Sequence, residues 1–266
     1  MQSSASNIPD FEGGPLYKGG RSNGLNGIHL PVETFVRLKL PNAIVAGRIR
    51  HCAREQIRRH RHDDGFLAIV LEGRYIEAGD TGQHGVGPGD VIFHRRWENH
   101  LNEVGPSGSS VLVLPIDSGW AGGVRGVVAD PEAIAKLAER DTRAALDLVR
   151  QTIVDRAVVD LDWPALLATR LRRHLDTDLK AWAHEMGLHP GSLSRGFRQA
   201  FGTTPAAYRL AQKTRRALAL IEDRSLKLTT VAANSGFADQ PHMVRSVREA
   251  TGRIPSALRR LTTTTL

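Results

Sequence analysis

Histidines in the first half of the 266-residue sequence and arginines in the second half are the side chains best suited to chemistry. His60 and His62 alternate just before and into a predicted strand, and His100 follows later in the chain. Alternate residues of a strand face the same side, so the two imidazoles of His60 and His62 lie together. Imidazole binds divalent transition metals and is also a polar group that lines small-molecule pockets. The pattern leaves both uses open, together with a third in which the histidines only form hydrogen bonds.

Basic side chains are concentrated towards the carboxyl terminus. Residues 165–266 hold 17 lysines and arginines against 7 acidic residues, whereas residues 1–164 hold 19 against 21. The net charge of the whole chain is +8. This asymmetry predicts that residues 165–266 contact a polyanion, with solvated helix faces as the alternative.

Composition excludes several other classes of protein. Hydrophobic residues make up 41% and charged residues 24%, as in ordinary globular proteins. The single cysteine, Cys52, excludes an internal disulfide and a thiolate metal site, and we expect it to be a small buried side chain. No apolar stretch reaches the ~20 residues of a membrane span, and the first residues lack a secretory pattern. We therefore expect a cytoplasmic protein with no membrane partner and no cofactor.

Two kinds of element must position the histidines and the arginines. Residues 1–26 are rich in Gly, Ser and Asn and predict a flexible arm. Residues 27–126 contain short apolar runs bounded by Gly and Pro, such as the run that ends before Gly73, and predict the strands of a sandwich or barrel. Residues 127–160 predict a helical connector, and residues 161–266 predict short helices separated by Gly or Pro. The expected fold is α+β with two domains, an all-β domain followed by an all-α domain.

The first part of the all-α domain predicts a helix-turn-helix unit. A helix over residues 179–186 is followed by Gly187, and Pro190 opens a second helix. Leu193, Phe197 and Phe201 form the buried stripe of this second helix. The side chains left on its outer face are small or hydrogen-bonding, as contact with base edges in a major groove requires. They are Gly191, Ser192, Ser194, Arg195, Arg198 and Gln199.

The same arrangement recurs farther along the chain. Gly236 forms the turn, Asp239 caps the second helix, and Met243 and Val247 face inward. A helix over residues 205–223, roughly 28 Å long, joins the two units. Successive major-groove faces lie about 34 Å apart on one side of B-DNA, so the two units can occupy neighbouring groove segments. The outward residues of the second unit are Gln240, His242, Arg245 and Arg248.

The stretch from Trp163 to Arg260 resembles the DNA-binding domain of AraC/XylS-type transcriptional regulators. The resemblance implies that Gly191, Ser194 and Arg195 read bases, that Ser192 and Arg198 lie nearer the phosphates, and that Pro241, His242 and Arg245 act in the second unit. Met243 and Val247 stand where the family usually has Phe, and Pro241 replaces a small polar residue. These departures predict a second unit that binds more weakly or mainly through backbone contacts. The residues that carry the resemblance are Ala183, Gly187, Leu193, Arg195, Phe197, Gly202, Pro205, Tyr208, Ala217, Leu220, Ala232, Gly236, Phe237, Asp239, Gln240, Arg245, Gly252 and Pro255.

The histidine region resembles the two motifs of a cupin, a double-sheet jelly roll. In metal-binding cupins the equivalents of His60, His62 and His100, with one glutamate, hold a divalent metal. Phe66 stands near the position of that glutamate, and Asp63 and Asp64 are out of register by two or three residues. We therefore expect these three histidines to line a pocket for a small organic effector, and to be the ligands if a metal binds. The other motif residues are Gly82, Pro88, Gly89 and Asp90, and His84 and His94 are expected to line the pocket or lie at the surface.

These patterns together predict a sequence-specific transcriptional regulator, not an enzyme, that binds double-stranded promoter DNA under the control of a small-molecule effector. The family resemblance implies a homodimer contact through Leu137 and Leu148 of the connector, and RNA polymerase is a further candidate partner. One alternative is a metal-dependent cupin enzyme, such as a dioxygenase, with a helical appendage. Another is a nucleoid-type protein that binds DNA without sequence preference.

Overall fold

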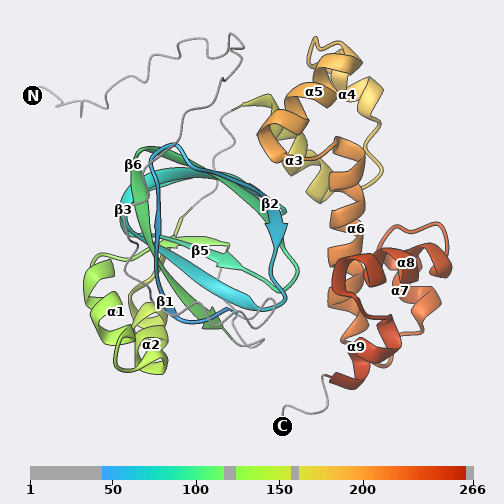
Figure 1. Cartoon of the computed structure of the whole chain (residues 1–266). Helices are drawn as coiled ribbons and strands as arrows, with labels where there is room; N and C mark the ends of the chain where they lie inside the picture. The colour runs from blue at the N-terminus through green and yellow to red at the C-terminus, as the bar shows by residue number, and fades with distance from the viewer. Residues whose placement is uncertain (1–43, 117–123, 157–161, 262–266) are drawn as a thin grey trace, which may run out of the picture. The chain divides into compact units, whose positions relative to one another are not determined.

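The described part of the chain begins with strands and ends with helices. The computed structural model describes residues 44–116, 124–156 and 162–261, and Figure 1 shows the order of their elements. This order agrees with the predicted succession of strands and helices, whereas the predicted arm of residues 1–26 lies outside the described residues. The strands are β1 (Gly47–His51), β2 (Gln56–Arg61), β3 (Gly65–Gly79), β4 (Gly82–Val86), β5 (Asp90–His94), β6 (Asn99–Ile116), β7 (Arg125–Val127) and β8 (Val154–Asp155).

These strands belong to one antiparallel sheet. Its hydrogen-bonded path runs β1-β6-β3-β5-β7-β8, while β2 pairs with β6 and β4 pairs with β3. The two long strands, β3 and β6, pair from Gly65 opposite Ile116 to Gly79 opposite His100, with two register shifts between these ends. Among the described strands the path ends at β1 and at β8, so hydrogen bonds do not close the sheet into a barrel. The antiparallel sheet is confirmed, and the cupin jelly roll is not.

The apolar run at the start of β3 is continuous because both of its faces are buried. Leu67, Ile69 and Leu71 belong to one hydrophobic core, and the alternate residues Phe66, Ala68 and Val70 belong to another. This division follows the two-residue period of a strand. The strand does not end at Gly73 as predicted, because it passes two bulges and continues to Gly79 in pairing with β6.

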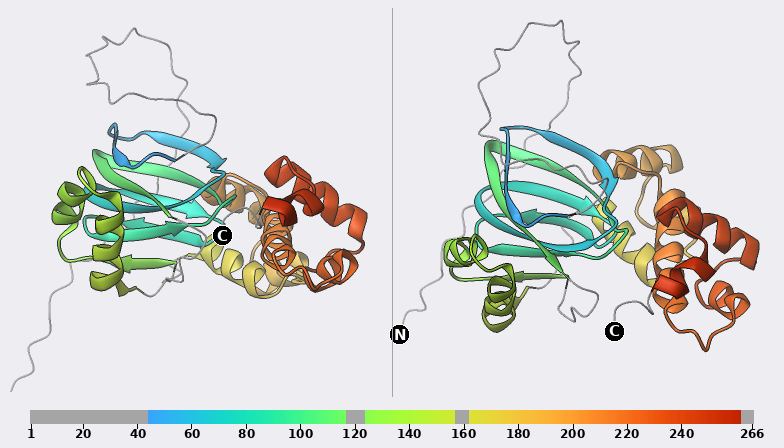
Figure 2. Two further views of the ribbon diagram at one scale, coloured as in Figure 1. Left: turned by 90° about the horizontal axis from the view of Figure 1, so that it is seen from below. Right: turned by 60° about the horizontal axis from the view of Figure 1, so that its bottom comes forward.

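Two helices of the predicted connector cover one face of the sheet, as Figure 2 shows. They are α1 (Pro131–Ala138) and α2 (Thr142–Thr152), and each begins at an aspartate whose carboxylate accepts a backbone N–H of the first turn. Their buried residues pack with β3, β5 and β6. Leu137 and Leu148, the predicted dimer contacts, are partly buried against this same core. Their apolar surface is therefore shared with the sheet, and the dimer stays a prediction.

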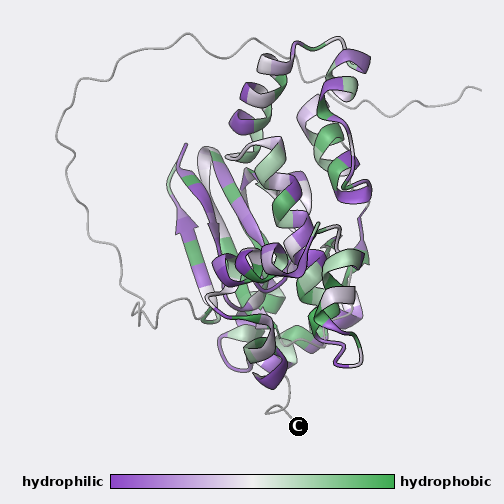
Figure 3. Ribbon diagram, turned by 90° about the vertical axis from the view of Figure 1, so that its right-hand side faces the viewer, coloured by the Kyte–Doolittle hydropathy of each residue, from purple (hydrophilic) through white to green (hydrophobic). Residues whose placement is uncertain are grey.

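The helices after residue 161 form two hydrophobic cores. The first combines residues of α3 to α6 with Ala78 and Leu101 of the sheet, and the second combines the end of α6 with α7, α8 and α9. Hydrophobic and hydrophilic residues alternate along these helices in Figure 3, as amphipathic helices around a shared core require. They are α3 (Trp163–Arg173), α4 (Leu179–Glu185), α5 (Pro190–Phe201), α6 (Pro205–Ile221), α7 (Leu228–Asn234), α8 (Gln240–Thr251) and α9 (Pro255–Leu261).

The described residues all lie within one compact unit, which spans Lys39–Leu266. Contacts between the sheet and the later helices are therefore contacts inside this unit. Within the described residues, none of the helices has the length and apolar character that a membrane crossing would need.

Candidate functional site

The first helix-turn-helix unit consists of α4 and α5. The turn between them passes through Gly187, whose φ of 65° is a left-handed conformation that a glycine adopts without strain. Leu193, Phe197 and Phe201 of α5 are buried as predicted. The rings of Phe197 and Phe201 stack with their centroids 4.6 Å apart, and both meet Tyr208 of α6 edge to face. The aromatic stripe thus fixes which face of α5 remains outside.

The outer face of α5 carries the residues predicted to contact DNA. Gly191, Arg195, Arg198 and Gln199 are exposed, and Ser192 and Ser194 are half-buried. Within the described residues, the guanidinium groups of Arg195 and Arg198 form no hydrogen bond or ion pair. Both side chains are therefore available to a ligand outside the chain.

The second unit consists of α7 and α8 and places its predicted residues in the same way. Pro241, Arg245 and Arg248 are exposed, while Gln240 and His242 are half-buried. The His242 ring packs edge to face on Phe237 with centroids 5.1 Å apart, so part of its surface is used inside the domain. The residues in the usual Phe positions, Met243 and Val247, are fully buried and complete the core of this unit.

One helix, α6, supports both units. It has 17 residues and is about 26 Å long, because it ends at Ile221 rather than at Asp223. Its first turns pack with α5, and its last turns pack with α7 and α8. The Asp223 carboxylate accepts the backbone N–H of Ser225, which favours a turn over a further helical residue.

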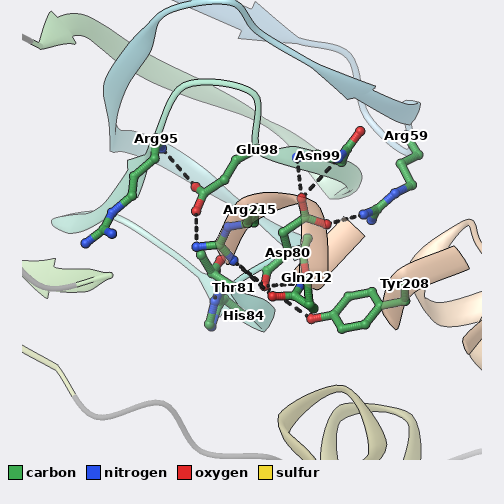
Figure 4. A network of polar contacts seen from close by, with 11 residues as sticks. Arg59, Asp80, Thr81, His84, Arg95, Glu98, Asn99, Tyr208, Gln212 and Arg215 are labelled. Atoms are coloured by element: carbon green, nitrogen blue, oxygen red, sulfur yellow. Dashed lines mark hydrogen bonds and ion pairs between the residues drawn. The ribbon is translucent and has the colours of Figure 1, made fainter. Parts of the chain in front are cut away.

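A polar stripe of α6 is bound to Asp80, the residue directly after β3, as Figure 4 shows. The backbone carbonyl of Asp80 accepts hydrogen bonds from the Tyr208 hydroxyl at 3.2 Å, from Gln212 Nε2 at 3.0 Å and from Arg215 Nη1 at 2.9 Å. Arg215 Nη2 also lies 2.9 Å from Oε1 of the buried Glu98. The sequence did not reveal this contact, because it joins residues that are far apart in the chain.

The Asp80 side chain links the same point to two strands. Its carboxylate pairs with Arg59 of β2 and accepts both the backbone N–H and the side-chain amide of Asn99 on β6, each at 3.0 Å. Arg59 also donates to the carbonyl of Phe201 at the end of α5. Asp80 is therefore a hub for hydrogen bonds among β2, β3, β6 and α6, and we call it the Asp80 hub.

His60 and His62 lie together as the strand spacing predicted, His100 lies beside them as the cupin resemblance implied, and the three have more neighbours than expected. His60, His62 and His100 each offer a ligand atom within 4.8 Å of the others, and so do Glu77, His94 and His100. We call these five residues the histidine cluster. The carboxylate comes from Glu77 in the distal half of β3, not from the position of Phe66 or from Asp63 and Asp64. His94 and His84 are both buried.

Burial controls the protonation of four members of the cluster. Burial first, and neighbouring histidines second, lower the pKa of His94 to about 3 and that of His62 to about 4. Burial likewise holds the pKa of His100 well below its ordinary value and raises the pKa of Glu77. These imidazoles are therefore neutral at physiological pH, with lone pairs free to bind a ligand.

Two other features differ from the sequence analysis. Cys52 is exposed, not buried, because it lies in the turn between β1 and β2 and not within a strand. A cleft of about 600 Å³ lies between the sheet and α6, and it does not include the three predicted pocket histidines. Apolar residues such as Trp97 and Leu218 line it together with five arginines, which are Arg95, Arg96, Arg172, Arg215 and Arg216.

Comparison with known proteins assigns the helical part. Residues 182–261 match the family described as "Helix-turn-helix domain". Over 82 residues the chain is 33% identical to the arabinose operon regulatory proteins of Salmonella typhimurium (strain LT2) and Escherichia coli (strain K12). The carboxy-terminal domain is of the AraC/XylS type. This confirms the predicted resemblance, and the AraC-type domain contains α5, α6 and α8.

The similarity is limited to this domain. The matched segment is 31% of this chain and 29% and 28% of the two regulatory proteins, so the chain spans less than a third of their length. Among solved structures, ToxT from Vibrio cholerae is 9% identical, and the alignment covers 82% of this chain and 98% of that chain with a TM-score of 0.37.

Proposed function

We propose that the protein is a sequence-specific transcriptional regulator that binds double-stranded promoter DNA. The observation that carries this proposal is the pair of helices α5 and α8, each with a buried apolar stripe and an outer face of exposed arginines, on a single supporting helix. The AraC-type match supports the same conclusion. The nucleoid-type alternative differs only in specificity, and the experiment below separates the two.

The roles of the outer residues follow from their chemistry. Arginine can donate two hydrogen bonds to a guanine edge, and small residues let a helix backbone approach the groove. We assign base contacts to Arg195, with Gly191 and Ser194 beside it, and to Arg245, with Pro241 and His242 beside it. Phosphate contacts are assigned to Ser192 and Arg198, and Gln199, Gln240 and Arg248 complete the interface.

The proposed organisation places a sensor domain at residues 27–126, a connector at 127–160 and the DNA-binding domain at 161–266. The sensor is a cupin-like domain that binds the effector through His60, His62 and His100, and the cleft beside α6 is a second location with room for an organic anion. The effector regulates DNA binding only if its affinity differs between two arrangements of the chain. We propose no catalytic activity, and we keep the homodimer, RNA polymerase contact and cytoplasmic location as parts of the proposal.

The experiment is to select genomic fragments bound by the purified full-length protein, to sequence them, and to measure the affinity for the recovered site. We expect a shared sequence motif, and we expect random DNA to compete at least a hundredfold less well than the recovered site. Arg143→Ala is the matched control, because Arg143 is an exposed arginine of α2 outside the AraC-type domain. Fragments without a common motif, or equal competition by random DNA, would contradict sequence-specific regulation.

A further inference from the structure

We propose that Arg59 and Arg61 of β2 are positioning residues for DNA recognition. They fix the angle between α5 and α8, the recognition helices of the two units, and with it the spacing of the two DNA subsites that these helices contact. We call this pair of residues the arginine clasp. The inference rests on the proposed function, which it deepens by naming specificity-determining residues outside the AraC-type domain.

The two faces of β2 have different neighbours, because successive side chains of a strand point to opposite sides. His60 lies opposite His100 on β6, and the centroids of their rings are 4.3 Å apart. Arg59 and Arg61 therefore share the other face, and each binds a helix, at residues that lie 142 and 188 positions later in the chain. One face of the strand thus belongs to the histidine cluster, and the other contacts the AraC-type domain.

Both arginines donate to a carbonyl in the last turn of a recognition helix. Arg59 Nη1 lies 3.2 Å from the carbonyl oxygen of Phe201, the last residue of α5. Arg61 Nη2 lies 2.8 Å from the carbonyl oxygen of Glu249, close to the end of α8. The last carbonyls of a helix have no partner inside it and carry the negative end of the helix dipole, so they favour a guanidinium. One strand therefore holds the same end of both recognition helices.

The contact with α5 is closely packed. Gly202, which ends α5 with a φ of 64°, leaves so little room that a Cβ there would lie 2.9 Å from Leu101 Cδ2 and 3.3 Å from Arg59 Cβ. The Arg59 guanidinium is itself held by the buried carboxylate of Asp80, as Figure 4 shows. The end of α5 is thus fixed against the sheet.

The contact with α8 is more open. A cavity of about 180 Å³ separates the sheet from α6 and α8, and Arg61 and Glu249 both line it. Gly252, which ends α8, has nothing within 4 Å of the position of a Cβ, in contrast to Gly202. Arg61 therefore holds α8 across a cavity by a side chain, and loss of this side chain should free the angle of α8 more than its fold.

The clasp adds a second connection between the two units. Their cores are separate, and α6 contributes to both, so α6 sets the distance between the units. A single connecting helix leaves their angle to its own bending and twisting, whereas a strand bound to both recognition helices restricts that angle. The clasp holds the ends of α5 and α8, while Arg195 and Arg245 lie exposed in the first halves of these helices. The faces predicted to contact DNA therefore stay free.

A fixed angle should make the protein sensitive to the spacing of its DNA subsites. One inserted base pair moves the second subsite by about 3.4 Å along the duplex and turns it by about 35°. Clasped helices cannot follow this change without breaking a contact, whereas a released α8 can adapt to it. The clasp should thus appear as a preference for one spacing.

The first experiment measures the angle without DNA, by pulsed EPR of spin labels on the two units of the full-length protein. The labels are attached at Glu185→Cys in α4 and Thr230→Cys in α7, both exposed positions, after Cys52→Ser. We expect one narrow distribution of distances with the clasp intact and a broader one in Arg61→Gln. Arg58→Gln is the matched control and should not change the distribution, because Arg58 is an exposed arginine of the same strand whose guanidinium has no hydrogen bond or ion pair among the described residues.

Arg59 is tested together with its buried partner. Arg59→Gln alone would leave the Asp80 carboxylate without its cation, so this variant also carries Asp80→Asn, and Asp80→Asn alone is its control. The distribution should broaden in the double variant and not in the control. Circular dichroism and urea unfolding show whether each variant folds. If the double variant does not fold, Arg61→Gln and Arg58→Gln decide the matter.

The second experiment measures the preference for spacing on DNA. Affinity is determined for the recovered site and for versions with one base pair inserted or removed between the two subsites. The wild type and Arg58→Gln should prefer the recovered spacing by about tenfold. Arg61→Gln should bind the recovered site more weakly, because α8 is no longer held in place before binding, and should prefer its spacing by less than about threefold.

The outcomes separate this inference from the proposed function. An unchanged distance distribution in the folded clasp variants overturns the clasp. A spacing preference that is absent in the wild type or undiminished in Arg61→Gln overturns its role in specificity, as does tighter binding of the recovered site by Arg61→Gln. A wild type that binds random DNA as well as the recovered site overturns the proposed function, and the spin labels still decide whether the clasp fixes the angle.

Discussion

Arg215 and Glu98 form an ion pair, and replacing one of them should have a very different effect on stability from replacing the other. The Glu98 side chain is 4% exposed and that of Arg215 is 26% exposed, with Arg215 Nη2 2.9 Å from Glu98 Oε1. Arg215→Gln leaves a buried carboxylate without its cation, which should lower the free energy of unfolding by about 3–5 kcal/mol. Glu98→Gln leaves a guanidinium that reaches water and still donates to the Asp80 carbonyl, so about 1 kcal/mol is expected.

The double variant tests whether the unpaired charge is the cause. With both groups replaced by glutamine, neither charge of this pair remains, so Glu98→Gln in the Arg215→Gln background should recover most of the lost stability. If the loss instead arose from the missing hydrogen bond between Arg215 and Asp80, the second substitution would recover nothing.

The effect should also depend on pH. Burial raises the pKa of Glu98 above its ordinary value, even though Arg215 opposes the shift. Because the folded carboxyl takes up a proton more readily than the unfolded one, its destabilising effect is present above the folded pKa and decreases as the pH falls towards the ordinary carboxyl range. Arg215→Gln should therefore lie closer to Glu98→Gln in stability at pH 5.5 than at pH 7.5.

Urea unfolding at both pH values, followed by tryptophan fluorescence and circular dichroism, measures these differences. The exposed pair Arg150–Asp147 on α2 provides the control, and Arg150→Gln should change the free energy of unfolding by less than about 1 kcal/mol. Equal losses in Arg215→Gln and Glu98→Gln, or a larger loss in Glu98→Gln, would refute the reasoning from burial.

Three further predictions concern the AraC-type domain. Arg195→Ala or Arg245→Ala should weaken binding to the recovered DNA site by about 1–3 kcal/mol in a gel shift, and an unchanged affinity would remove that residue from the interface. Binding should fall steeply with added salt because phosphate contacts release counterions, so a flat salt series would argue against the arginine faces. Gly196→Ala places a Cβ 2.4 Å from the Trp163 ring, so it should lower stability by about 1–3 kcal/mol in urea unfolding, whereas a gain would show that the ring moves aside.

The helix-turn-helix units were predictable because local sequence determines them. A left-handed glycine, a capping aspartate and an apolar residue at every third or fourth position act within a few residues of each other. Gly187, Asp239 and the stripe of Leu193, Phe197 and Phe201 all occupy the predicted places. The later end predicted for α6 was wrong, because hydropathy does not reveal the Asp223 turn.

The histidine cluster was only partly predictable. Strand alternation reveals His60 and His62, but Glu77 comes close to His94 and His100 only because β3 continues past Gly73 and stays paired with β6. The one indication in the sequence that Glu77 belongs to a strand was the alternation of Tyr75, Glu77 and Gly79. Closure of the sheet and the exposure of Cys52 likewise depend on pairings and turns between distant segments, which composition and spacing do not specify.

The connecting helix explains how one event in the sheet could reach both DNA-binding units. Tyr208, Gln212 and Arg215 lie at intervals of four and three residues, so they form one stripe of α6, and this stripe binds the Asp80 hub. The other sides of α6 pack with α5 and α8. A change at the hub therefore acts on the element that sets the spacing of both recognition helices, and not on either helix alone. If the sheet binds the proposed effector, linkage requires that promoter DNA which favours one arrangement of α6 changes the affinity for that effector by the same factor.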